Sequence, residues 1–167
     1  MLLSHAAPAN VKTQYHQHSL IPSEPLPLQY KLNNMDNASR RNFSSGAKWE
    51  PIVGYSRAVR IGQVIEVAGT CSVDQEGNPV GAGDAYQQTK RILEIIHDAI
   101  THLGGRMEDI VRTRIFTTDI ALWTEIGKAH GEVFHSINPV TTMVEVSNLI
   151  SADYLVEIEA TAIVTTM

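Results

Sequence analysis

The sequence predicts an α+β domain in which two helices cover one face of a mixed β-sheet. Two late stretches, residues 140–146 and 155–164, are rich in β-branched residues and alternate with the period of half-buried strands. Two stretches with helical apolar spacing follow Asp84 and Asp119, which belong to the residue types that cap helices. With a hairpin before both helices, the expected order of elements is β-β-α-β-α-β-β.

The first 40 residues differ in composition from the rest of the chain. They hold four of the seven prolines and three of the seven histidines, without a sustained apolar period. We therefore expect an extended or disordered arm over residues 1–40 and a folded domain over residues 41–167. Because no basic segment precedes the short apolar start, we do not expect a secretory signal.

The domain is expected to open with a hairpin and a helix. Strands at residues 56–61 and 64–70 meet at Gly62, which suits the first position of a tight turn. Asp84 then caps a helix that carries an apolar stripe, and a glycine pair beginning at Gly104 ends it.

A third strand and a second helix follow before the last two strands. The third strand is expected at residues 110–118, and Asp119 caps a helix that runs to about His135. In each of the last two strands, alternation separates an apolar row from a row that carries glutamates. We expect this second row to share the uncovered face of the sheet: Thr141, Met143, Glu145, Leu155, Glu157 and Glu159.

The glutamates of this face have two interpretations. If Glu145, Glu157 and Glu159 line a partly buried cleft, repulsion and desolvation would raise at least one pKa and suit that group to proton transfer. Alternatively, they pair with Arg112 and Arg114 as structural salt bridges. In either case, a bare face with several large apolar residues favours a closed homo-oligomer.

The composition limits the classes of function. A formal charge of −5 over 167 residues argues against a nucleic-acid partner, which would need a basic patch. The single cysteine, Cys71, excludes an internal disulfide and fits a reducing compartment. No apolar run approaches the ~18 residues that suggest a membrane helix. We therefore expect a cytoplasmic protein without membrane contact.

Metal, nucleophile and nucleotide motifs are not indicated. The pairs His97/His102 and His130/His135 are five residues apart, whereas a helical metal site needs a spacing of three or four, so we expect no metal. Cys71 has no histidine nearby in the sequence, which favours a small buried cysteine over a nucleophile. The glycines form neither a GxGxxG motif nor a P-loop.

Five short segments have the order and spacing of a known family: GYSRA from Gly54, VAGT from Val67, FTTD from Phe116, VEV from Val144 and EIEA from Glu157. They lie within residues 52–164 and resemble the reactive intermediate deaminase (Rid/YjgF/L-PSP) family. The resemblance implies a chorismate-mutase-like fold. It also implies a homotrimer with clefts for small molecules between subunits, acting without a cofactor.

The resemblance further implies roles for individual residues. Members hydrolyse reactive enamines and imines, such as 2-aminoacrylate, to keto acids and ammonia. By position, Glu157 would place water or move a proton, and Tyr55 would help to shape the cleft. Backbone groups at Gly69 and Thr70 would contact the substrate. The arginine that clamps the substrate carboxylate would fall at Thr141, which cannot supply a bidentate cation.

This departure at Thr141 leaves several hypotheses open. Met143 replaces the family's usual cysteine, and Arg114 is the candidate for the missing cation beside Glu145 in the pocket. The first hypothesis is an enzyme that hydrolyses or tautomerises a small enamine, imine or related carbonyl compound. The alternative is a non-catalytic trimer that binds a small ligand or a protein. Endoribonuclease or translation-inhibitor activity, suggested by older family names, fits the acidic charge least.

Overall fold

The computed structural model describes residues 39–165. In this part of the chain one sheet has the strand order β1-β2-β3-β6-β4-β5. β4 and β5 run parallel, and the other neighbouring strands run antiparallel. The strands are β1 (Arg41–Phe43), β2 (Ala58–Ile61), β3 (Val64–Thr70), β4 (Ile110–Thr117), β5 (Val140–Glu145) and β6 (Val156–Ile163). The helices are α2 (Trp49–Val53), α3 (Ala85–His102) and α4 (Trp123–Phe134), with 3₁₀ turns η1 (Met107–Asp109) and η2 (Ile120–Leu122).

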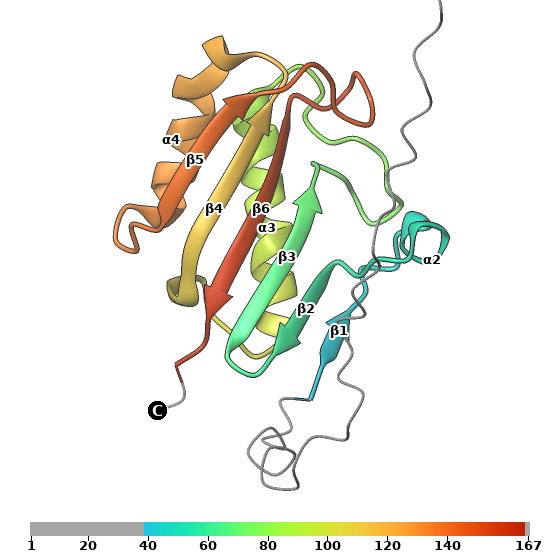
Figure 1. Cartoon of the computed structure of the whole chain (residues 1–167). Coiled ribbons are helices and arrows are strands. Elements are labelled where there is room, and N and C mark those ends of the chain that lie inside the picture. The colour runs from blue at the N-terminus through green and yellow to red at the C-terminus, as the bar shows by residue number, and fades with distance from the viewer. Residues whose placement is uncertain (1–38, 166–167) are drawn as a thin grey trace, which may run out of the picture. The chain divides into compact units, whose positions relative to one another are not determined.

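The predicted fold class is confirmed. In the view of Figure 1, α3 and α4 lie behind the sheet and cover one of its faces. The predicted order β-β-α-β-α-β-β runs from β2 to β6. Two short elements precede it: β1, which extends the sheet beside β2, and the helix α2. The predicted arm lies outside the described residues, except for positions 39 and 40.

The ends of the predicted helices are determined by local residues that cap them or allow the chain to turn. The Asp84 carboxylate accepts a hydrogen bond of 2.9 Å from the Gln87 amide, which satisfies a donor left open at the start of α3. Just after α3, Gly104 has a φ of 77°, a conformation that glycine adopts without steric cost. Asp119 accepts a bond of 2.9 Å from the amide of Ala121 and begins η2, which leads into α4.

The core lies between the helices and the sheet. α3 contributes Ile92, Ile96 and Ile100, and the sheet contributes Ile115 and Ile158, all of them at most 1% exposed. Burying each such side chain stabilises the fold by roughly 1.5–3 kcal/mol. Along β6, buried residues alternate with half-buried ones, as the period of two predicts.

The predicted face of β5 is wrong. Both rows of this edge strand mix apolar side chains with threonine or polar ones, so alternation alone does not identify the covered row. The parallel register with β4 decides it, because the β4 partners are buried on the helix side. Glu145 therefore lies on the opposite face from Glu157. The pairs are Thr113 with Thr141, Ile115 with Met143, and Thr117 with Glu145.

The other face of the sheet is not covered by α3 or α4. Five apolar side chains on this uncovered face are between 41% and 57% exposed. Rows of exposed apolar side chains of this kind mark surfaces that associate with another molecule. The residues are Ile61, Val64, Val140, Val144 and Ile163.

Candidate functional site

Glu157 lies on the uncovered face, where β6 meets the end of β3. The pairing of these strands shifts its register between Val67 and Thr70, and Gly69 lies in this irregular stretch against the Glu157 side chain. A Cβ atom on Gly69 would lie 1.9 Å from Oε1 of Glu157. Only glycine therefore leaves room for the carboxylate in its observed position.

Cys71 follows β3, and its thiol reaches the same carboxylate. Sγ lies 3.7 Å from Oε2 of Glu157, within the range of a thiol hydrogen bond. Burial, together with the charge of Glu157 and this hydrogen bond, raises the pKa of Cys71 to about 12. The thiol therefore stays protonated near neutral pH and donates to Glu157. It lacks the thiolate character that a nucleophile needs.

Arg57 forms the other side of the same site and is only 9% exposed. Its Nη1 donates to the carbonyl oxygen of Gly69 at 2.7 Å and to Oγ1 of Thr70 at 3.0 Å. Its Nη2 lies 3.4 Å from the Tyr55 hydroxyl, and its guanidinium carbon lies 5.6 Å from the centre of that ring. We call this group the Glu157 cluster: Tyr55, Arg57, Gly69, Thr70, Cys71 and Glu157.

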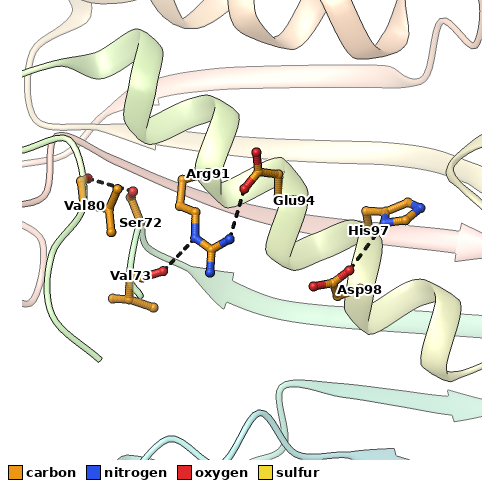
Figure 2. A network of polar contacts seen from close by, with 7 residues as sticks. All are labelled: Ser72, Val73, Val80, Arg91, Glu94, His97 and Asp98. Atoms are coloured by element: carbon orange, nitrogen blue, oxygen red, sulfur yellow. Dashed lines mark hydrogen bonds and ion pairs between the residues drawn. The ribbon is translucent and has the colours of Figure 1, made fainter. Parts of the chain in front are cut away.

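The chain that leaves Cys71 is held against α3 (Figure 2). The Ser72 hydroxyl donates to the carbonyl oxygen of Val80 at 2.8 Å and closes the loop between them. Nε of Arg91, on α3, donates to the carbonyl oxygen of Val73 at 2.8 Å. These contacts fix the course of the chain after β3 and thereby support the thiol beside the carboxylate.

Thr141, Met143 and Glu145 do not join the Glu157 cluster within one chain. Oγ1 of Thr141 lies 2.9 Å from Oγ1 of Thr113. Met143 packs against the core, and the Glu145 carboxylate accepts a bond of 2.9 Å from the amide of Ile120. All three side chains belong to the face that the helices cover.

Thr113 also links β5 to α4 through His130. Nε2 of His130 lies 3.0 Å from Oγ1 of Thr113, and its ring centre lies 4.4 Å from that of Phe134. Burial lowers the pKa of His130, so the imidazole is neutral at pH 7. A shallow pocket of about 150 Å³ lies beside it, lined by His130, Gly131, Phe134, His135, Asn138 and Pro139.

Acidification is expected to destabilise the protein through His130. Because its folded pKa lies below the ordinary value of 6.5, the unfolded chain binds more protons in the range just below that value. The free energy of unfolding should be unaffected by this group above pH 6.5 and should fall as the pH drops from there towards the folded pKa. Urea denaturation on both sides of this range measures the effect.

The control for this prediction is His130→Gln, which cannot titrate and keeps hydrogen-bonding capacity towards Thr113. The variant should lose less stability on acidification than the wild type. The same pH dependence in both proteins would show that His130 does not produce it.

Arg114, the predicted replacement for the missing cation, is paired within the chain. Its Nη1 lies 2.9 Å from Oε2 of Glu159. Both side chains are more than a third exposed, so the pair contributes little to stability. This contact supports the salt-bridge interpretation for Arg114 and not a guanidinium that is free to bind a substrate carboxylate.

The sequence does not point to Arg57 or Cys71 as residues of this site. Arg57 lies in the GYSRA segment, two positions after Tyr55, and strand alternation places it on the uncovered face with Val59. That alternation is the signal that could have identified it. Cys71 carries no such signal, because its partner lies 86 positions away in the sequence.

No group of three or more His, Cys, Asp and Glu side chains within residues 39–165 is arranged to hold a metal ion. In the same part of the chain, no helix combines the length and the apolar character needed to cross a membrane.

Comparison with known proteins shows similarity over most of the chain. The family model described as Endoribonuclease L-PSP matches residues 46–164. An uncharacterized protein of Streptomyces coelicolor is 36% identical over 129 residues, which cover 77% of this chain and 95% of the relative. The 3-aminoacrylate deaminase RutC of Acinetobacter baylyi is 31% identical over 112 residues, which cover 67% of this chain and 88% of RutC. A solved structure from Mycobacterium tuberculosis, described as a member of the YjgF/YER057c/UK114 family, has a TM-score of 0.70 and 48% identity, and the match covers 75% of this chain and 100% of that one.

Proposed function

This chain belongs to the reactive intermediate deaminase (Rid/YjgF/L-PSP) family, and on that premise we propose that it hydrolyses a small enamine or imine at the Glu157 cluster. The observation that carries the proposal is the position of the Glu157 carboxylate. It lies against Gly69, where a larger residue would collide with it, and it contacts the protonated thiol of Cys71. A carboxylate in this position can accept a proton from water and return it to a leaving group. The similarity to a named 3-aminoacrylate deaminase supports the reaction type.

Hydrolysis at this site requires only proton transfers and one water molecule. An enamine first takes a proton from solvent at carbon and becomes an iminium ion. Water then adds its oxygen to the iminium carbon while Glu157 accepts one of the water protons. Glu157 passes that proton to the nitrogen, the C–N bond breaks, and the remaining hydroxyl proton returns to solvent, so that ammonia leaves a carbonyl compound behind. Tyr55 and the backbone groups at Gly69 and Thr70 would orient the substrate.

We further propose a homotrimer as the working form. Neighbouring subunits would cover the apolar side chains exposed on the uncovered face. Thr141, Met143 and Glu145 lie on the other face from Glu157 in one chain. They could therefore line the same cleft only if a second subunit supplied them.

A non-catalytic trimer that binds a small ligand or a protein is the second candidate. Two contacts favour it, because each engages a residue expected at the carboxylate-binding position. Thr141 is bonded to Thr113, and Arg114 is paired with Glu159. A nuclease role has less support, since the chain carries a formal charge of −5.

Hydrolysis of 2-aminoacrylate and 3-aminoacrylate by the wild type and by Glu157→Gln tests the proposal. The amide keeps the size of the side chain but cannot accept the proton, so kcat should fall by about a hundredfold. Release of the carbonyl product measures turnover.

The matched control is Glu159→Gln, which lies on the same face of the same strand and loses only an exposed ion pair. It should retain nearly all activity. If the wild type hydrolyses both substrates no faster than buffer alone does, the non-catalytic ligand-binding trimer becomes the better-supported function. An active Glu157→Gln would remove Glu157 from the mechanism.

A further inference from the structure

The Glu157 carboxylate has one hydrogen-bond donor within residues 39–165, the thiol of Cys71. Sγ lies 3.7 Å from Oε2, and none of the ion pairs in this part of the chain includes Glu157. The next glutamate on the same face has a stronger partner, because Glu159 is paired with Arg114 at 2.9 Å. The orientation of the Glu157 carboxylate therefore depends on a thiol and not on a cation.

The end of β3 bounds both oxygens of this carboxylate. Oε1 lies where a Cβ atom on Gly69 would approach it to 1.9 Å. Oε2 faces the thiol of Cys71, two positions further along the chain. The first contact prevents the carboxylate from moving towards the strand, and the second holds it by a hydrogen bond. Together they select one orientation of the Glu157 side chain.

The kind of donor matters for a group that must accept and release a proton. A cationic donor such as arginine would strongly favour the charged carboxylate and oppose its protonation. A thiol is a weak and neutral donor, so it orients the carboxylate and leaves the other lone pairs open to water. This property suits a group that holds a general base in place.

The segment that carries the thiol is anchored to α3 (Figure 2). Nε of Arg91 donates to the carbonyl oxygen of Val73 at 2.8 Å. The fully buried Ser72 donates to the carbonyl oxygen of Val80 at 2.8 Å. The backbone that follows Cys71 is thus fixed independently of the contact between the thiol and the carboxylate.

The same helix also fixes the chain that leads to Glu157. Oε1 of Gln88 accepts a bond of 2.8 Å from the amide of Leu155, two positions before Glu157. Nε2 of Gln88 donates to the carbonyl oxygen of Gly81 at 3.2 Å, in the loop that follows Cys71. α3 therefore holds both partners of the contact.

We propose that Cys71 is a positioning residue of this site, whose protonated thiol holds the Glu157 carboxylate in the orientation from which it exchanges protons with water. This inference rests on the proposed function, and it identifies the group that orients the proton acceptor. Cys71 acts through Glu157 and forms no bond with the substrate.

Kinetics of 2-aminoacrylate hydrolysis by three variants test this role. Cys71→Ser keeps a donor, Cys71→Ala removes it, and Cys71→Val removes it but fills the volume of the thiol. The two variants without a donor should lose about tenfold in kcat, with KM changed by no more than about twofold. Cys71→Ser should keep kcat within about threefold of the wild type. A role in packing alone predicts the opposite order, with Cys71→Val the most active of the three.

The contact is also measurable from the thiol, without turnover. Burial is the largest cause that raises the pKa of Cys71, followed by the charge of Glu157 and the hydrogen bond to it, whereas the charge of Arg57 lowers it. Glu157→Gln removes the negative charge, so more of the thiol should ionise at mildly alkaline pH. Because Cys71 is the single cysteine of the chain, alkylation by iodoacetamide measures this group alone. Its rate should rise about threefold to tenfold in Glu157→Gln.

The control for alkylation is Glu159→Gln, which removes a carboxylate from the same face of β6. Its charge is not among those that act on the thiol, so its alkylation rate should equal that of the wild type. An equal rate in Glu157→Gln and the wild type would overturn the contact. Full kcat in Cys71→Val, or a loss in Cys71→Ser as large as that in Cys71→Ala, would overturn the positioning role.

The two measurements separate this inference from the proposed function. If the wild type shows no turnover but Glu157→Gln accelerates alkylation, the thiol holds the carboxylate and the hydrolase proposal fails. If turnover requires Glu157 but both variants without a donor keep full kcat, the hydrolase proposal stands and the role of Cys71 fails. The alkylation measurement needs no change at Cys71, so it decides even if the Cys71 variants do not fold.

Discussion

Replacing Gly69 by alanine is expected to remove nearly all turnover while the protein stays folded. The added Cβ would lie 1.9 Å from Oε1 and 3.0 Å from the carboxyl carbon of Glu157, so the carboxylate must leave its position. The methyl group would also occupy space beside the carboxylate, where the proposed function would place the substrate. A loss of kcat/KM by about a thousandfold is expected, which combines the loss of proton transfer with poorer positioning.

Stability should change little in this variant. The obstructing atoms are the far end of a flexible side chain, which can rotate away, and the φ of Gly69 is not positive. Thermal unfolding and 2-aminoacrylate hydrolysis measured on the same sample separate the two effects. The matched control is Gly127→Ala on α4, where an added Cβ meets nothing within 4 Å. Full activity in Gly69→Ala would show that the observed position of Glu157 is not the working one.

Replacing Gln88 by leucine is expected to cause the largest loss of stability among the changes considered. Gln88 lies on α3 and is 0% exposed. Its Nε2 donates to the carbonyl oxygens of Asp153 at 2.7 Å and Gly81 at 3.2 Å. Its Oε1 accepts a bond of 2.8 Å from the amide of Leu155. Leucine fills a similar volume but leaves these backbone groups without their partner, at a cost of about 2–4 kcal/mol.

Chemical denaturation measures this loss, and Gln87→Leu provides the control. Gln87 is the next residue along the helix and is exposed, so its replacement should change the free energy of unfolding by no more than about 0.5 kcal/mol. Because Leu155 leads directly into β6, Gln88→Leu should also disturb the approach to Glu157 and reduce turnover in the folded fraction. A loss of stability as small as that of Gln87→Leu would show that the three hydrogen bonds are dispensable.

The sequence by itself determined the elements whose signals are local. The Asp84 cap and Gly104 bound α3, and the alternation of β6 assigns Ile158 to the core and Glu157 to the opposite face. These features depend on neighbouring residues and on backbone periodicity, which a single strand or helix displays in its own sequence. The same signals led to the fold class.

Only the tertiary structure decided which side chains meet. β5 carries apolar and threonine residues on both rows, so its face depends on the buried residues of β4 beside it. Cys71 meets Glu157 across 86 positions, and Arg57 reaches Gly69 across 12. Arg114 is engaged by Glu159 across 45 positions. Such contacts depend on strand register and on a local irregularity at the end of β3, which are properties of paired strands and not of either strand alone.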